Sequence, residues 1–123
     1  MLKKMNVYLE SPALWSLYYQ EDGWDLVEFT IQESNMNAMI PHWGLLEIER
    51  AIQKRLNQKE LTGREAEDLR GFIDADVKQL LFNSKLTIIP VSNDIMEHAK
   101  DLIPKYNLYA ADAVHLATKD IVL

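Results

Sequence analysis

The 123-residue sequence has no cysteine, four glycines and four prolines, and no long apolar run. Without cysteine, disulfides and thiolate metal sites are excluded. A membrane span needs roughly 18 consecutive apolar residues, and no stretch approaches that length. The N-terminus has two lysines but no apolar core of a signal peptide. We therefore expect a cytoplasmic protein. Because there is also no linker-like or low-complexity segment, we expect one domain over residues 1–123.

Positive charge is also scarce. Thirteen lysines and arginines stand against 19 aspartates and glutamates, which gives a net charge of −6 at pH 7. This balance argues against a protein that holds nucleic acid by bulk electrostatics. A polyanionic substrate would need a local basic patch or bridging cations. The apolar share of 48% and the charged share of 26% are typical of an ordinary globular domain.

Short apolar runs alternate with helical patterns along the chain. The runs at residues 6–10, 37–40 and 86–91 predict strands, and the final residues 121–123 resemble the start of another. Apolar spacing predicts helices at 11–19, 24–33, 42–57, 62 to about 80, 93 to about 105, and 109–118. Strands separated by helices, without hairpin turns, predict an α/β fold with three layers, in which helices cover both faces of a short parallel sheet.

Several residues have the chemistry of helix ends. Ser11, followed by Pro12, is a candidate N-cap. Thr62 and Glu65 match the capping box, in which each side chain satisfies a free backbone donor. Asn107 is suited to the left-handed conformation that ends a helix.

Three acids stand out as candidate metal ligands: Glu10 after the first strand, Glu47 in the helix at 42–57, and Asp112 in the last helix. In parallel sheets, ligands collect at the carboxyl ends of the strands, where Glu10 lies. Carboxylates that converge from separate segments repel one another unless a hard divalent cation neutralises them. Such a cluster suits metal-assisted hydrolysis of phosphodiesters.

Each acid also has a simpler explanation. Glu47 shares a helical face with Arg50 and Lys54, and from spacing alone an exposed charged cluster is the more common case. Glu10 could be a surface acid beside a helix N-terminus. The face that carries Asp112 also carries His115 and Lys119, opposite a face of alanine and valine. For His115 we favour a hydrogen-bonded structural role over metal ligation.

Aromatic and basic residues leave alternatives open. Trp15, Tyr18 and Tyr19 could stack on bases, although aromatics on amphipathic helices more often belong to a core or a dimer surface. Lys54 and Arg55 are candidates for a basic patch, although charge runs on helices are usually solvated.

The segments "VYLESPALWSLYY", "GLLEIERAIQKR" and "YNLYAADAVHLAT" resemble, in this order, the motifs of the PIN domain. The likeness is to the small prokaryotic ribonucleases that are the toxins of VapBC-type toxin–antitoxin pairs, and it covers essentially the whole chain. Carried over by position, it places Glu10, Glu47 and Asp112 at the family's metal-binding acids. This sequence departs from the family pattern at Glu10, where the family usually has aspartate, and at Pro12, where the family usually has a hydroxyl residue.

The resemblance implies an endoribonuclease that depends on Mg²⁺ or Mn²⁺, cleaves an RNA substrate, forms homodimers and is inhibited by a small antitoxin protein. The family continues after its late helix into another strand with a further acid, so the C-terminal strand region is expected to be incomplete at Leu123. The alternative function is a catalytically inactive PIN-like module for binding or oligomerisation.

Overall fold

Three parallel strands form the centre of the molecule in this computed structural model, which describes residues 4–123. The strands are β1 (Met5–Tyr8), β2 (Met36–Pro41) and β3 (Leu86–Ile89), and they lie side by side in that order. Ala38 in β2 is in register with Val7 on one side and Leu86 on the other. All three carboxyl ends therefore meet at one edge of the sheet, as the absence of hairpin turns predicted.

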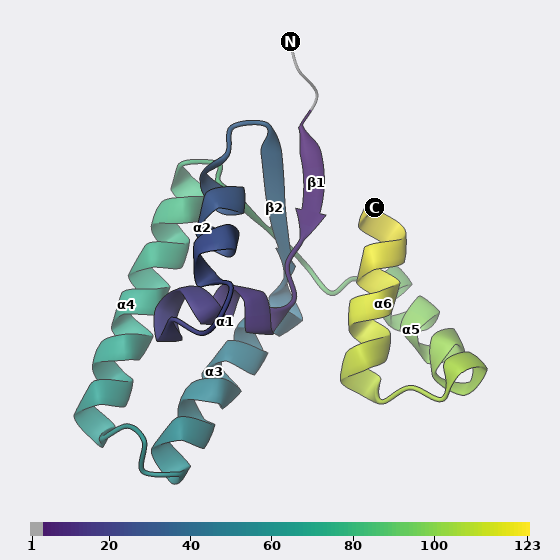
Figure 1. Cartoon of the computed structure of the whole chain (residues 1–123). Helices are drawn as coiled ribbons and strands as arrows, with labels where there is room; N and C mark the ends of the chain where they lie inside the picture. The colour runs from purple at the N-terminus through teal and green to yellow at the C-terminus, as the bar shows by residue number, and fades with distance from the viewer. Residues whose placement is uncertain (1–3) are drawn as a thin grey trace.

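Helices pack on both sides of this sheet (Figure 1). One side carries α1 (Ser11–Tyr19), α2 (Trp24–Gln32), α3 (His42–Asn57) and α4 (Gly63–Phe82), and the other carries α5 (Asn93–Tyr106) and α6 (Ala110–Val122). The predicted α/β fold with three layers is confirmed. Among the described residues, no helix has the length and apolar character that a bilayer span requires.

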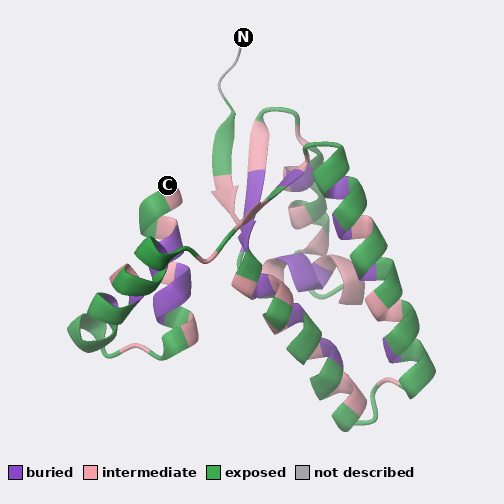
Figure 2. Ribbon diagram, turned by 180° about the vertical axis from the view of Figure 1, so that it is seen from behind, coloured by how far each residue is buried: buried purple, intermediate pink, exposed green. Residues whose placement is uncertain are grey.

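The buried hydrophobic residues form two separate clusters, and Figure 2 marks the buried positions on the ribbon. The larger one fills the space between the sheet and α1 to α4, and includes Leu14, Ile40 and Ile52, each at most 1% exposed. The smaller one lies between α5 and α6 and is built on Ala113 and Ala117, which are fully buried. These alanines let the two helices approach closely, so α5 and α6 pack mainly on each other.

Most helix ends follow the expected local chemistry. The Thr62 hydroxyl accepts a hydrogen bond from the backbone N–H of Glu65, whose carboxylate accepts one from the backbone N–H of Thr62. Asn107 ends α5 at φ 55°. The prediction for Ser11 was wrong by one residue, because Glu10 is the N-cap of α1 and Ser11 is its first helical residue.

The strand predicted at residues 121–123 was also wrong. Ile121 and Val122 form the last turn of α6, and the backbone N–H of Leu123 donates to the carbonyl of Lys119. No glycine or proline interrupts the sequence after Asp112, so the helical pattern continues.

Helix α3 packs very closely on β2 at Gly44. A Cβ atom at this position would lie 2.9 Å from Cγ1 of Ile40, which is fully buried. Only glycine permits this approach without a shift of the strand side chain. The contact fixes the start of α3, and therefore the position of Glu47 one turn later.

Candidate functional site

Charged side chains from the β1–α1 connection, α3 and α6 lie near the carboxyl edge of the sheet. Glu10 lies two residues after the end of β1, Glu47 lies in the second turn of α3, and Asp112 lies in the first turn of α6. Two of these acids contact side chains of α6. The chain segments involved are more than 60 residues apart, so the fold alone brings them together.

Glu47 is joined to β1 through His115. The Nε2 atom of His115 is 2.5 Å from Oε1 of Glu47, and its Nδ1 atom is 2.6 Å from the hydroxyl of Tyr8. The Tyr8 and His115 rings meet edge to face, with centroids 6.0 Å apart. The result is a continuous chain of hydrogen bonds from strand β1 through α6 to α3.

The chemistry of the three groups fixes the direction of these bonds. A carboxylate can only accept, so the Nε2–H of His115 donates to Glu47. In the neutral imidazole, Nδ1 then accepts from the Tyr8 hydroxyl. His115 is only 8% exposed and both of its nitrogens are satisfied. Its hydrogen-bonded role, favoured from the sequence, is confirmed, although the ring is buried and not at the surface.

The phenol of Tyr8 is held in its neutral form. Burial raises its pKa well above the usual range, and the negative charges of Glu10 and Glu47 raise it further. Tyr8 therefore acts at neutral pH as a hydrogen-bond donor and not as a phenolate.

Glu10 is paired with Lys119. The Nζ atom of Lys119 lies 2.7 Å from Oε1 of Glu10 and 5.4 Å from the centroid of the Tyr8 ring. The hydrogen bond from Lys119 lowers the pKa of Glu10, against a smaller opposing effect of burial. The carboxylate of Glu10 is therefore ionised and carries an internal counterion.

Asp112 differs from the other two acids. It is exposed, and it lies on the same face of α6 as His115 and Lys119, because positions i, i+3 and i+7 align on a helix. Over residues 4–123, the structure brings no three Asp, Glu or His side chains together in the arrangement that a metal ion needs. Asp120 pairs with His98 on α5 at 2.8 Å and lies apart from these acids.

The donor set nevertheless has the chemistry that Mg²⁺ and Mn²⁺ prefer. The three acids supply carboxylate oxygens. Two of the carboxylates already have partners, because Lys119 compensates the charge of Glu10 and His115 donates to Glu47. Lys119 is thus the counterion of Glu10. Carboxylate oxygens suit a divalent ion by their chemistry, but the side chains in the described part of the chain are not arranged to hold one.

A cavity of about 210 Å³ opens beside Glu47. Its wall includes Ser11 and Trp15 from α1, and Lys54 and Arg55 from the next turns of α3. Arg55 already bridges Glu21 and Glu60, at 3.0 and 2.7 Å. Lys54 is exposed and makes no ion pair within residues 4–123, so its positive charge is uncompensated at the wall of this cavity.

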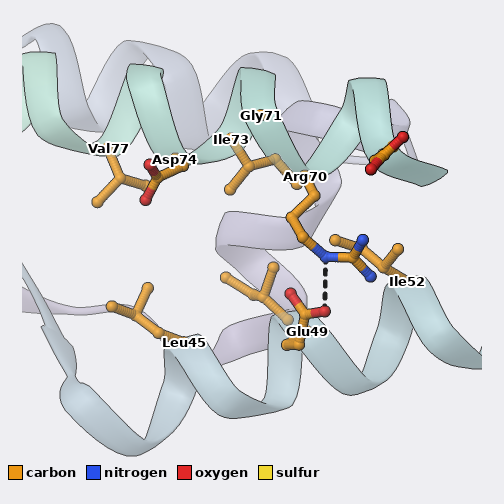
Figure 3. Close-up of a pocket in the computed structure, with 10 residues that line it drawn as sticks. Leu45, Glu49, Ile52, Arg70, Gly71, Ile73, Asp74 and Val77 are labelled. Atoms are coloured by element: carbon orange, nitrogen blue, oxygen red, sulfur yellow. Dashed lines mark hydrogen bonds and ion pairs between the residues drawn. The ribbon is translucent and has the colours of Figure 1, made fainter. Parts of the chain in front are cut away.

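A larger groove of about 540 Å³ separates α3 from α4 (Figure 3). Its floor is apolar, with Leu45, Ile52 and Val77, and the ion pair between Glu49 and Arg70 spans it at 2.7 Å. The further acids Glu67 and Asp74 line the groove, so its charge is negative overall.

Sequence reasoning named three acids as candidate metal ligands, but it missed the side chains that contact two of them, Glu10 and Glu47. Tyr8 was not singled out, although it lies two residues before Glu10 and strand geometry places i and i+2 on one face. Lys119 and His115 were noted on the Asp112 face, but spacing within one helix could not reveal their partners on β1 and α3.

The sequence matches no known family profile and no curated protein. Among solved structures, a chain of a toxin–antitoxin complex from Klebsiella pneumoniae is similar to this protein, with a TM-score of 0.59 and 18% identity. The alignment covers 94% of this chain and 78% of that chain. At this identity the likeness establishes a shared fold.

Proposed function

We propose that this protein is the toxin of a type II toxin–antitoxin pair, an endoribonuclease of the PIN type that hydrolyses RNA phosphodiesters with Mg²⁺ or Mn²⁺. The observation that carries the proposal is the convergence of Glu10 and Glu47 at the carboxyl edge of a parallel sheet, next to the face of α6 that presents Asp112. The fold shared with a chain of a toxin–antitoxin complex supports it.

In this proposal Glu10, Glu47 and Asp112 hold the divalent ion. When bound, such an ion lowers the pKa of water and neutralises charge on the phosphodiester. The chain itself supplies orientation. Tyr8 fixes His115, and His115 fixes Glu47, so the carboxylate of Glu47 has a defined direction before any ligand arrives.

Lys54 is the residue that we propose to contact the RNA backbone. It lines the cavity beside Glu47 with its charge free of ion pairs in the described part of the chain. A local cation of this kind compensates for the acidic net charge of the protein. Replacement of Lys54 by methionine is expected to raise KM for RNA and to weaken the salt dependence of binding, because one phosphate contact is lost.

The antitoxin partner is proposed to insert an amphipathic helix into the groove between α3 and α4. The apolar floor suits the apolar face of such a helix, and the acidic lining suits basic residues at its borders. Co-expression with the product of any short open reading frame adjacent to the gene tests this. The charge reversal Glu67→Lys is expected to weaken the complex, whereas Glu97→Lys on α5 is not. Equal capture by both variants would contradict this groove as the docking surface.

The proposal also includes homodimers of the toxin, and light scattering tests for them.

The second candidate is a PIN-like module that binds partners without catalysis. It is favoured by the internal compensation of the acids, since Lys119 and His115 satisfy Glu10 and Glu47 without any metal. In this case the polar network serves to dock α6 onto the rest of the molecule.

Cleavage of a mixed RNA substrate with added Mn²⁺ separates the two candidates. We expect the wild type to cleave, EDTA to stop cleavage, and Glu47→Gln and Asp112→Asn to lower the rate by about 100-fold, as is common for loss of metal support. Asp101→Asn, an equivalent change at an exposed acid of α5, serves as the control. If Asp112→Asn and Asp101→Asn cleave like the wild type, the nuclease proposal is lost. A partner bound without cleavage would support the second candidate.

A further inference from the structure

We infer that the tip of the hairpin formed by α5 and α6, residues 103–110, is a platform on which an unpaired base of single-stranded RNA stacks. Tyr106 and Tyr109 supply the aromatic rings, and Lys105 supplies a positive charge for the adjoining phosphate. The inference rests on the proposed function, because it names the form of RNA that the protein binds and the residues that select it.

Two tyrosines at this tip are open to solvent. Tyr109, the N-cap of α6, is 84% exposed, and Tyr106, the last residue of α5, is 55% exposed. A flat nucleobase that covers such a ring removes apolar surface from water. Trp15, a stacking candidate from the sequence, is only 5% exposed, and its ring stacks on Tyr19 instead. The tip therefore offers the aromatic faces that a base can reach.

The backbone of the tip is anchored to the rest of the hairpin. The N–H groups of Asn107 and Leu108 both donate to the carbonyl of Ile103. The side chain of Leu108, between the two tyrosines, packs against the smaller hydrophobic cluster. A platform that is already held in place loses little conformational entropy when a base stacks on it.

The charge of the tip differs from that of the whole protein. Residues 102–111 contain one charged side chain, Lys105, although the chain has a net charge of −6. The Nζ atom of Lys105 lies 5.3 Å from the centroid of the Tyr106 ring, and it makes no ion pair within residues 4–123. A nucleotide matches both groups, because its base stacks on a ring while its phosphate meets the cation. An apolar segment of a partner protein would cover the rings but leave the ammonium group without an anion.

The platform lies on the same side of the molecule as the candidate site. Figure 1 shows the connection between α5 and α6 at the end toward which β1 and β2 point, which is the carboxyl side of the sheet. Tyr109 precedes Asp112 by three positions, so both residues lie at the start of α6, about one turn apart. A nucleotide stacked on Tyr109 therefore has its backbone beside Asp112. In a duplex the bases already stack on one another, so only an unpaired base can use the platform.

Fluorescence anisotropy of a labelled single-stranded RNA oligonucleotide, measured in EDTA, tests the inference without any cleavage. We expect Tyr109→Ala to bind about five- to tenfold more weakly than the wild type, the lower part of the range for loss of one stacked base. Tyr109→Phe keeps the ring and should bind like the wild type. Phe82→Ala, at an aromatic residue that is 85% exposed at the end of α4, is the matched control and should leave the affinity unchanged.

Two further measurements separate stacking from attraction between charges. Lys105→Met should weaken binding and make it less dependent on salt, because one phosphate contact is lost. A duplex RNA of the same length has no unpaired base, so Tyr109→Ala should bind it like the wild type. If Tyr109→Ala weakens binding of both RNAs equally, or of neither, stacking is refuted. Circular dichroism confirms that each variant is folded.

The outcomes separate this inference from the proposed function. If Tyr109→Ala binds single-stranded RNA like the wild type, and the wild type cleaves RNA with Mn²⁺, the platform is refuted while the nuclease proposal stands. If Tyr109→Ala binds more weakly but the wild type cleaves no RNA, the inference holds and the nuclease proposal fails. If Tyr109→Ala keeps its affinity for RNA but no longer captures a co-expressed partner protein, the tip is a protein-docking surface and the inference is overturned. It is also overturned if the wild type binds neither RNA.

Discussion

Replacement of Tyr8 by phenylalanine tests the hydrogen-bonded chain that orients Glu47. The change removes one hydroxyl from the 2.6 Å contact with Nδ1 of His115 and keeps the aromatic ring. Because His115 is only 8% exposed, water cannot readily replace the lost donor. The variant therefore isolates the contribution of one polar contact at the edge of the sheet to the free energy of unfolding.

The magnitude follows from the burial of His115. A buried acceptor left without a partner costs about 1–3 kcal/mol. The lower half of this range applies here, since the Tyr8 side chain is itself only partly buried and phenylalanine is less costly to desolvate. For a chain of this length, about 1–2 kcal/mol corresponds to a decrease in melting temperature of about 4–8 °C.

Urea denaturation followed by circular dichroism measures the change. The matched control is Tyr106→Phe, at a tyrosine that is 55% exposed, which should change the free energy of unfolding by less than about 0.5 kcal/mol. The urea dependence of the free energy should be the same in both variants. If Tyr8→Phe and Tyr106→Phe unfold at the same urea concentration, the Tyr8 hydroxyl does not support His115 and the argument for an oriented Glu47 is wrong.

Three further predictions concern the fold and its titration. Gly44→Ala should lower the free energy of unfolding by about 1–2 kcal/mol in urea denaturation, because the added methyl group meets the side chain of Ile40. Gly71→Ala should raise it by up to about 1 kcal/mol, because a methyl group there meets nothing within 4 Å. Stabilisation by both substitutions would contradict the close approach at Gly44. Thr62→Ala removes the capping box and should cost about 1 kcal/mol in the same assay, unless α4 is held by packing alone. Burial raises the pKa of both Tyr8 and Tyr18, so near-ultraviolet absorbance should show these two phenols still protonated above pH about 10. Since unfolded tyrosines ionise there, stability should fall as pH rises through this range, and a complete titration of five tyrosines in the folded state would refute it.

Local chemistry was sufficient to predict the elements but not their contacts. The helix at 42–57 has the predicted bounds in the structure. Its apolar spacing is a local pattern, and Pro41 marks its start. The capping box at Thr62 is equally local. The strand predicted at residues 121–123 failed because three apolar residues at the end of a helix carry no signal that distinguishes them from a strand.

The contacts of the candidate site could be predicted even less from local patterns. From spacing, Glu47 appeared to be part of an exposed cluster with Arg50 and Lys54, and the pattern within α3 gave no reason to prefer another partner. Its actual partner, His115, lies 68 positions away, and only the packing of α6 against the sheet edge creates the contact. Asp112 was placed on the correct face of α6 by the helical repeat, but its exposure depends on how deeply α6 docks, which periodicity does not encode.

The division of the interior into two hydrophobic clusters has a consequence for the acids. Glu10 and Glu47 are carried by segments attached to the larger cluster, whereas His115 and Lys119 belong to α6, which packs on the smaller one. The hydrogen bond from His115 to Glu47 and the ion pair between Lys119 and Glu10 therefore join the two parts of the molecule. Any opening of the α5–α6 hairpin that leaves the larger cluster intact uncovers two negative charges at once. Amide hydrogen exchange in α6 should consequently speed up when either contact is removed, so the mobility of α5 and α6 would report whether the two charges are paired.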